Sequence, residues 1–215
     1  MTARRHYTLT DRFLMAVDQA LRTVHAPPRT TGRPYPAEGI PEAEMSPAER
    51  DRSARLMRVD HAGEVAAQGL YQGQALFARD ERVKDQMLQS SEEENDHLAW
   101  CERRLQELGS RTSHLGPFWY TGSYAIGALA SLAGDRWSLG FVKETENQVV
   151  EHLDDHLRRL PPQDGRSRAI LEQMKIDEGH HAYKAHLAGA ADLPRPVKGL
   201  MRLTSKLMTN TAYWI

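Results

Sequence analysis

Cysteine is nearly missing from this sequence of 215 residues, because Cys101 is the only one. A single thiol cannot form an internal disulfide, and it cannot build the cysteine-rich ligand sets of zinc or iron–sulfur sites. A reducing compartment fits this composition best. An excess of charge of one sign is missing too: the net charge is −1 with the histidines neutral, which gives no indication of nucleic-acid binding.

Long uninterrupted apolar runs are also scarce. The N-terminal segment MTARRHYTLTDRFLMAVDQALRTV is basic at its start, but Asp11 and Asp18 interrupt its apolar stretch. It therefore lacks the apolar core and the small-residue cleavage site of a secretory signal, and it predicts a short amphipathic helix. Residues 112–134 contain no Asp, Glu, Lys or Arg, yet Pro117 and four glycines make them a poor membrane-spanning helix.

Two segments nevertheless suggest contact with a membrane surface. The charge-free segment contains Pro117-Phe118-Trp119-Tyr120, which we expect to be an interfacial aromatic cluster followed by a short apolar helix, facing the membrane or another subunit. Near the C-terminus, Lys198, Arg202 and Lys206 fall on one helical face. The opposite face carries Val197, Leu200, Met201, Thr204, Leu207 and Met208. This pattern predicts a basic amphipathic helix, as in interfacial anchors, although many such stripes simply pack against a core.

Runs of alternating β-branched residues, which mark strands, are missing as well. Residues 26–47 contain six prolines and two glycines, and they predict an extended linker after the first helix. Ser46-Pro47-Ala48-Glu49 has the pattern of a capping box and begins a long helix. Caps and breakers then predict helices over about 47–79, 80–109, 135–160 and 167–189, with a last short helix after Pro194 and Pro196. We therefore predict an all-α chain, residues 1–215 as one domain built on a four-helix bundle.

Metal-binding residue types recur at regular positions in the four long helices. Glu64 is followed 30 positions later by Glu94, and Glu146 is followed 32 positions later by Glu178. His97 and His181 complete two Glu-x-x-His motifs. Residues three apart share a helical face, so each motif can direct both ligands to one point inside the bundle. One Glu from each of two helices and a Glu-x-x-His from each of the other two is the dimetal arrangement of ferritin-like bundles.

The charge and chemistry of this set indicate the ion. Four buried carboxylates are very unfavourable without compensation, whereas two divalent cations neutralise them. Oxygen and imidazole ligands suit iron or manganese, with carboxylates bridging the two ions and each imidazole binding one. The spacing leaves alternatives open: Glu92 and Glu93 neighbour Glu94, the pair Asp177 and His180 competes with Glu178 and His181, and Glu144 and Glu151 compete with Glu146.

Several longer motifs resemble the demethoxyubiquinone hydroxylase family of ubiquinone biosynthesis, over almost the whole chain. They are Arg58-Val59-Asp60-His61-Ala62-Gly63-Glu64-Val65, Tyr71-Gln72-Gly73-Gln74-Ala75, Glu94-Asn95-Asp96-His97-Leu98-Ala99-Trp100-Cys101, Thr145-Glu146-Asn147-Gln148-Val149, His152-Leu153-Asp154-Asp155-His156 and Ile176-Asp177-Glu178. The resemblance implies a ferritin-like di-iron monooxygenase. The ligands that it implies are Glu64, Glu94, His97, Glu146, Glu178 and His181, which selects Glu146 over Glu144.

The resemblance also implies the reaction. The ring of a polyprenylated demethoxy-benzoquinol would be hydroxylated with O2 as co-substrate, one oxygen atom going to the ring and the other to water. Two iron ions per chain would serve this chemistry. Because the substrate is a membrane lipid, we expect peripheral attachment to the cytoplasmic face of the inner or cell membrane. A partner protein of the quinone pathway or a second copy of the chain is conceivable, and no nucleic acid is expected.

Three further residues are candidates for positions beside the ligands. His152 is predicted to bond a ligand carboxylate from another helix, and Asp60 to orient a ligand imidazole. An ordinary buried hydrogen bond is the alternative for both. Tyr71 lies two turns beyond Glu64 on nearly the same face, and we expect it to pack rather than to approach the cluster.

Three other functions are compatible with parts of the pattern. A non-catalytic ferritin-like iron protein would share the metal site but would need no apolar substrate channel. A helical lipid-binding or assembly protein would bind no iron. A radical generator resembling ribonucleotide reductase would need a dedicated tyrosine beside the cluster, for which Tyr71 alone is thin support. No nucleotide-binding fingerprint is present, so electrons would come from the quinol, a small carrier or a partner reductase.

Overall fold

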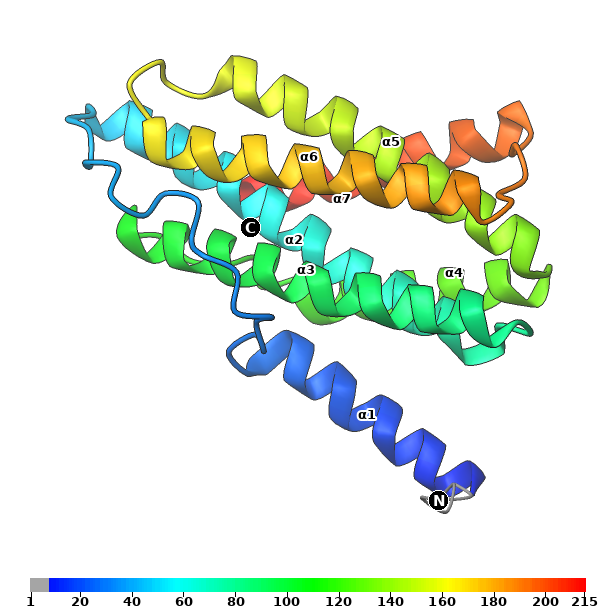
Figure 1. Ribbon diagram of the computed structural model, residues 1–215. Helices are drawn as coiled ribbons and strands as arrows, with labels where there is room; N and C mark the ends of the chain where they lie inside the picture. The colour runs from blue at the N-terminus through cyan, green and yellow to red at the C-terminus, as the bar shows by residue number, and fades with distance from the viewer. Residues whose placement is uncertain (1–7) are drawn as a thin grey trace.

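The computed structural model describes residues 8–215, which form seven helices and no strand (Figure 1), as the all-α prediction requires. The helices are α1 (Leu9–His25), α2 (Pro47–Phe77), α3 (Glu81–Glu107), α4 (Gly116–Leu132), α5 (Asp135–Arg159), α6 (Gly165–Leu187) and α7 (Arg195–Trp214). The four long helices of the predicted bundle are α2, α3, α5 and α6.

Short side chains and prolines set the helix ends much as the sequence suggests. Ser46 accepts a hydrogen bond from the backbone N–H of Glu49, whose carboxylate accepts one from the Ser46 N–H in return, so the predicted capping box is confirmed. Asp80 caps α3 as expected. The fourth bundle helix begins earlier than predicted: Asp164 caps α6 by accepting from the N–H of Ser167, which therefore lies inside the first turn.

The bundle consists of two helix pairs that face each other. In Figure 1 α5 and α6 form the upper layer, and α3 lies below with α2 behind it; α2 packs along α3, and α5 along α6. One apolar cluster includes Met57, Leu105 and Met174, and a second includes Met87 and Val142. In each bundle helix the predicted ligands lie between the residues of these two clusters. The polar centre therefore has a hydrophobic cluster on either side of it along the bundle.

Helix α4 packs closely on α2 because glycines let the two backbones approach. A Cβ atom added to Gly69 or Gly73 would meet the backbone of α4, and one added to Gly127 would meet the backbone of Leu70. Two of the three aromatic residues of the cluster at 117–120, which we expected to be interfacial, are buried. The cluster forms the first turn of α4, and this close packing buries Trp119 and Tyr120, while Pro117 and Phe118 remain exposed.

The C-terminal helix is longer than predicted. With 20 residues, α7 is not short, because Pro194 and Pro196 only set its start and nothing interrupts it afterwards. It packs on α2, where Ala212 is buried with Val59 and Ala62.

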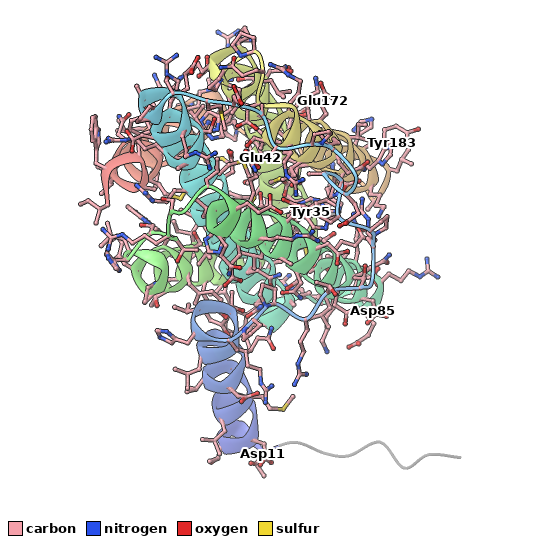
Figure 2. All side chains as sticks on the ribbon, turned by 90° about the vertical axis from the view of Figure 1, so that its left-hand side faces the viewer. Asp11, Tyr35, Glu42, Asp85, Glu172 and Tyr183 are labelled. Atoms are coloured by element: carbon pink, nitrogen blue, oxygen red, sulfur yellow. The ribbon has the colours of Figure 1, made fainter. Side chains whose placement is uncertain are left out.

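The N-terminal part of the chain lies outside the bundle. Helix α1 projects away from it (Figure 1) and touches α4 near Ala20 and Val24. Figure 2, which looks at the molecule from its side, shows the extended segment with Tyr35 and Glu42 lying over α3 and α6. Glu42 forms an ion pair with the buried Arg104 of α3 at 2.6 Å, so the predicted linker is fastened to the bundle.

Candidate metal centre

The structure brings all six predicted ligands together between the two helix pairs. On one side the Nδ1 atom of His97 lies 2.8 Å from Glu94, 3.2 Å from Glu178 and 3.6 Å from Glu64. On the other side the Nδ1 atom of His181 lies 3.0 Å from Glu94 and 3.2 Å from Glu178. Glu94 and Glu178 thus contact both imidazoles, each through a different oxygen, as carboxylates that bridge two ions would.

Glu146 completes the side of His181. Its Oε1 atom accepts a hydrogen bond of 2.6 Å from the hydroxyl of Tyr71, which is fully buried. The expectation that Tyr71 only packs is therefore wrong. Two helical turns return a side chain almost to the same face, and the tyrosine is long enough to reach a carboxylate on α5.

Burial makes this cluster electrostatically costly without cations. Glu64, Glu94, Glu146 and Glu178 are each at most 4% exposed. Burial and the charge of Glu94 raise the pKa of Glu64 well above its ordinary range, and burial with the charge of Glu178 does the same for Glu146. Burial would also raise the pKa of Glu94, but the neighbouring His97 and His181 hold that pKa well below its ordinary range. Burial and the neighbouring carboxylates therefore oppose the charged forms of Glu64 and Glu146, which added positive charge would stabilise.

The donor atoms themselves fit a metal. Within residues 8–215, both carboxylate oxygens of Glu94 and the Nδ1 atom of His97 are buried and have no partner in hydrogen-bond geometry. Buried polar atoms without a partner cost free energy, which ion coordination would remove. Glu64, Glu94, His97 and Glu178 each offer a ligand atom within 4.8 Å of the others. This Glu/His cluster could therefore bind metal, and its oxygen and imidazole donors suit iron or manganese.

The acidic residues that compete with the ligands in sequence have another place in the structure. The Nε2–H of His97 donates to Asp177 at 2.9 Å, and the Nε2–H of His181 donates to Glu93 at 2.7 Å. These bonds leave each Nδ1 atom facing the cluster and fix the orientation of the ring. Arg33 of the linker holds Asp177 in turn, at 2.7 Å.

The other residues that compete with the ligands in sequence lie away from the cluster. Glu92, Glu151 and His180 are exposed, and Glu144 forms an ion pair with Lys198.

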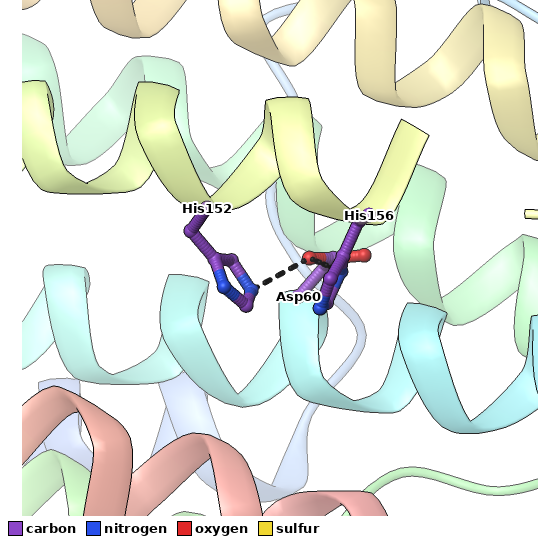
Figure 3. Close-up of side chains that lie close together, drawn as sticks. All are labelled: Asp60, His152 and His156. Carbon is purple, nitrogen blue, oxygen red and sulfur yellow. Dashed lines mark ion pairs between the residues drawn. The ribbon is translucent and has the colours of Figure 1, made fainter. Parts of the chain in front are cut away.

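Asp60 and His152 lie near the six residues but contact each other rather than them. The Nε2 atom of His152 is 3.4 Å from Oδ1 of Asp60, and the Nδ1 atom of His156 is 2.8 Å from the same oxygen (Figure 3). The imidazoles that Asp60 was expected to orient are instead held by Glu93 and Asp177. His156 was missed, although its spacing of four from His152 on one helix was a usable signal.

A large cavity reaches the cluster from one side. Its volume is about 490 Å³, and α2, α4, α5 and α7 form most of its wall, to which α6 contributes Glu178. Glu64, Glu146 and Glu178 lie at the wall together with mostly apolar residues, among them Leu200 and Met208 of the predicted amphipathic stripe. None of the helices within residues 8–215 combines the length and the hydrophobicity that crossing a bilayer requires.

Comparison with known proteins gives one consistent result. The family model described as ubiquinone biosynthesis protein COQ7 matches residues 51–212. A protein of Nitrosococcus oceani is 58% identical over 211 residues, 98% of this chain and 99% of its own, and one of Nitrosomonas europaea is 54% identical over 205 residues, 95% and 98%. Both are named 3-demethoxyubiquinol 3-hydroxylase. The chain belongs to the COQ7 family of ubiquinone biosynthesis proteins.

Proposed function

We propose that this chain is a 3-demethoxyubiquinol 3-hydroxylase, a di-iron monooxygenase that hydroxylates the ring of a polyprenylated demethoxy-benzoquinol. One observation carries the proposal: a buried cluster of four carboxylates and two imidazoles opens, through three of its carboxylates, into an apolar cavity. The relatives' printed name supports the choice of substrate. An iron-storage protein would have no use for such a cavity.

The chain's own residues would hold two iron ions and place the ring beside them. Glu64 with His97 on one side, Glu146 with His181 on the other, and Glu94 and Glu178 between them would hold the two ions. Bound iron would supply O2 activation, with one oxygen atom going to the ring and the other to water, and the quinol, a small carrier or a partner reductase would supply the two electrons that this requires. The apolar wall would exclude water from the reaction and direct an aromatic ring toward the carboxylates.

The cavity would receive its substrate from a membrane surface. Phe118 of α4 and Leu200 and Leu207 of α7 line the cavity and are more than 60% exposed. Arg202 and Lys206 are exposed on α7, where they could attract anionic lipid head groups. We therefore place the protein peripherally on the cytoplasmic face of the inner or cell membrane, with α4 and α7 toward the lipid.

Metal content and turnover together test this proposal. Protein produced with ample iron is expected to carry about two irons per chain, and to hydroxylate a short-chain demethoxy-quinol in an O2-dependent reaction. The variants Glu94→Ala and Glu178→Ala should lose most of the iron, since each removes a bridging carboxylate. Glu92→Ala, a neighbouring exposed glutamate, is the matched control and should retain both irons. Iron that is indifferent to the bridging substitutions would refute the site, and iron without hydroxylation would refute the reaction.

A further inference from the structure

A second group of metal-ligand residues lies outside the six. Asp60 projects from α2, and His152 and His156 project from α5, one helical turn apart, so that the three side chains meet between the two helices (Figure 3). Histidines at i and i+4 present their rings on one helical face. Each of the three residues offers a ligand atom, and these atoms lie within 4.8 Å of one another.

The spacing of these atoms matches coordination of one small ion. The two nitrogens lie 3.4 Å and 2.8 Å from the same carboxylate oxygen of Asp60. An ion with bonds of about 2.0–2.2 Å holds adjacent ligand atoms roughly 2.8–3.6 Å apart, from octahedral to tetrahedral geometry. Both distances from Asp60 to the histidine nitrogens therefore lie in the range that adjacent ligands of one ion show.

The donors also lack the hydrogen bonds that would explain their burial. Asp60 and His156 are 3% and 1% exposed. In the part of the chain that the structure describes, both carboxylate oxygens of Asp60 and the Nδ1 atom of His156 have no partner in hydrogen-bond geometry. A buried carboxylate in this position needs a positive charge, from a proton on an imidazole or from a cation.

We propose that Asp60, His152 and His156 bind a third metal ion, a divalent transition ion of the kind that prefers imidazole, such as zinc. Two neutral imidazoles and one carboxylate leave at least one coordination position open, as in catalytic zinc and mononuclear iron sites. His152 and Asp60 line the apolar cavity, so the open position faces it. The ion would join α2 to α5 across the cavity wall.

Zinc binding to the iron-loaded protein tests the site. Purified protein is incubated with ZnSO4, freed of unbound metal on a desalting column, and analysed for zinc and iron by elemental analysis. We expect about one zinc per chain in addition to the irons. His152→Ala, His156→Gln and Asp60→Asn should weaken zinc binding by more than about 100-fold while the iron content is unchanged. Cobalt in place of zinc should give a visible spectrum of nitrogen and oxygen ligation that the same variants lose.

His186→Ala, which removes an exposed histidine of α6, is the matched control and should bind zinc like the parent. Helix content measured by circular dichroism identifies any variant that does not fold, and His156→Gln keeps the size of the side chain. Zinc that is absent, that displaces iron, or that binds equally in the three variants would overturn the proposal. The iron count tests the di-iron centre and the zinc count tests this site, so either can fail alone.

Discussion

The two sides of the candidate metal centre differ in kind. Toward α4 and α7 it meets a mostly apolar cavity, whose wall includes the carboxylates Glu64, Glu146 and Glu178. Toward the linker it meets a polar pocket lined by Arg33, Glu93 and Asp177, among others. On this outer side the imidazoles of His97 and His181 are held by acidic residues.

This contrast separates two tasks. Carboxylates can change from one binding mode to another, and they stand where a reacting ring would arrive. Imidazoles whose Nε2 atom is held by an acidic residue have a fixed orientation, and they lie on the side away from the cavity, where no substrate has to enter. Substitutions of the apolar residues that line the cavity should therefore affect turnover at constant iron content. Substitutions of the acidic residues that hold the imidazoles on the outer side should affect iron affinity at constant cavity shape.

The largest effect is expected from filling the cavity. Gly63 lines it, and a Cβ atom added there meets nothing within 4 Å, so Gly63→Leu projects into the space that the ring would occupy. We expect kcat/KM to fall on the order of 100-fold while the iron content stays the same. Gly199→Leu places the same side chain in open space on α7, away from the cavity lining, and should leave turnover intact. Equal losses in both variants would contradict the assignment of the cavity.

The outer side should respond in iron affinity. Asp177→Asn and Glu93→Gln remove the carboxylates that hold the two imidazoles, and we expect iron to bind about 10-fold to 100-fold more weakly. Competition with a chelator measures this. Glu92→Gln changes an exposed residue of the same pocket that holds neither imidazole, and it provides the baseline. A fall in turnover of Asp177→Asn at full iron occupancy would contradict the expectation that residues on the outer side act only on iron affinity.

The close packing of α2 on α4 shapes the cavity wall, and a substitution of Gly73 tests how much stability depends on this packing. A Cβ atom at this position would overlap the backbone of α4, so Gly73→Ala must push the helices apart. We expect the free energy of unfolding of the apoprotein to fall by about 1–3 kcal/mol, measured in urea. Gly122→Ala, on α4 itself, has open space around its Cβ and should raise helix stability by about 0.5–1 kcal/mol.

The smallest effect concerns acid stability of the linker contact. Burial raises the pKa of Glu107, but hydrogen bonds from Arg166, Arg104 and Tyr35 outweigh burial and lower it. Because the unfolded chain then takes up the proton first, the stabilisation is complete above the ordinary pKa near 4.3 and is lost as the pH falls below it. Glu107 is partly exposed, so its contribution should be below about 1 kcal/mol. Urea midpoints between pH 6 and 3 should fall less steeply in Glu107→Gln than in the parent; parallel curves would exclude this contribution.

The bundle and the two Glu-x-x-His motifs could be predicted because local signals determine them, whereas the choice of Glu146 over Glu144 came from the family resemblance. Ser46 and Asp80 start helices by satisfying free N–H groups, and a Glu-x-x-His motif has one geometry once the helix forms. The spacing did not distinguish Glu178 from Asp177 as a ligand, since neighbouring residues differ by only about 100° around a helix. In the structure both are used, Glu178 inside the cluster and Asp177 behind His97.

What the sequence could not specify are the contacts between segments far apart in the chain. The link from Tyr71 to Glu146 spans 75 residues, and the pairing of Asp60 with His156 depends on how α2 faces α5. The burial of Trp119 and Tyr120 depends on the glycines that admit α4 against α2, a packing effect that hydropathy does not register.

The fastened linker has a consequence for the order in which the protein opens. It is attached mainly through side chains, with Thr31 donating to Asp96, Arg33 pairing with Asp177 and Glu42 pairing with Arg104. Such a segment can detach as one unit while the bundle stays folded, so its amides should exchange with deuterium sooner than those of α3 beneath it. Each detachment would expose the outer pocket, and iron could then enter or leave the centre without passing through the cavity that holds the ring.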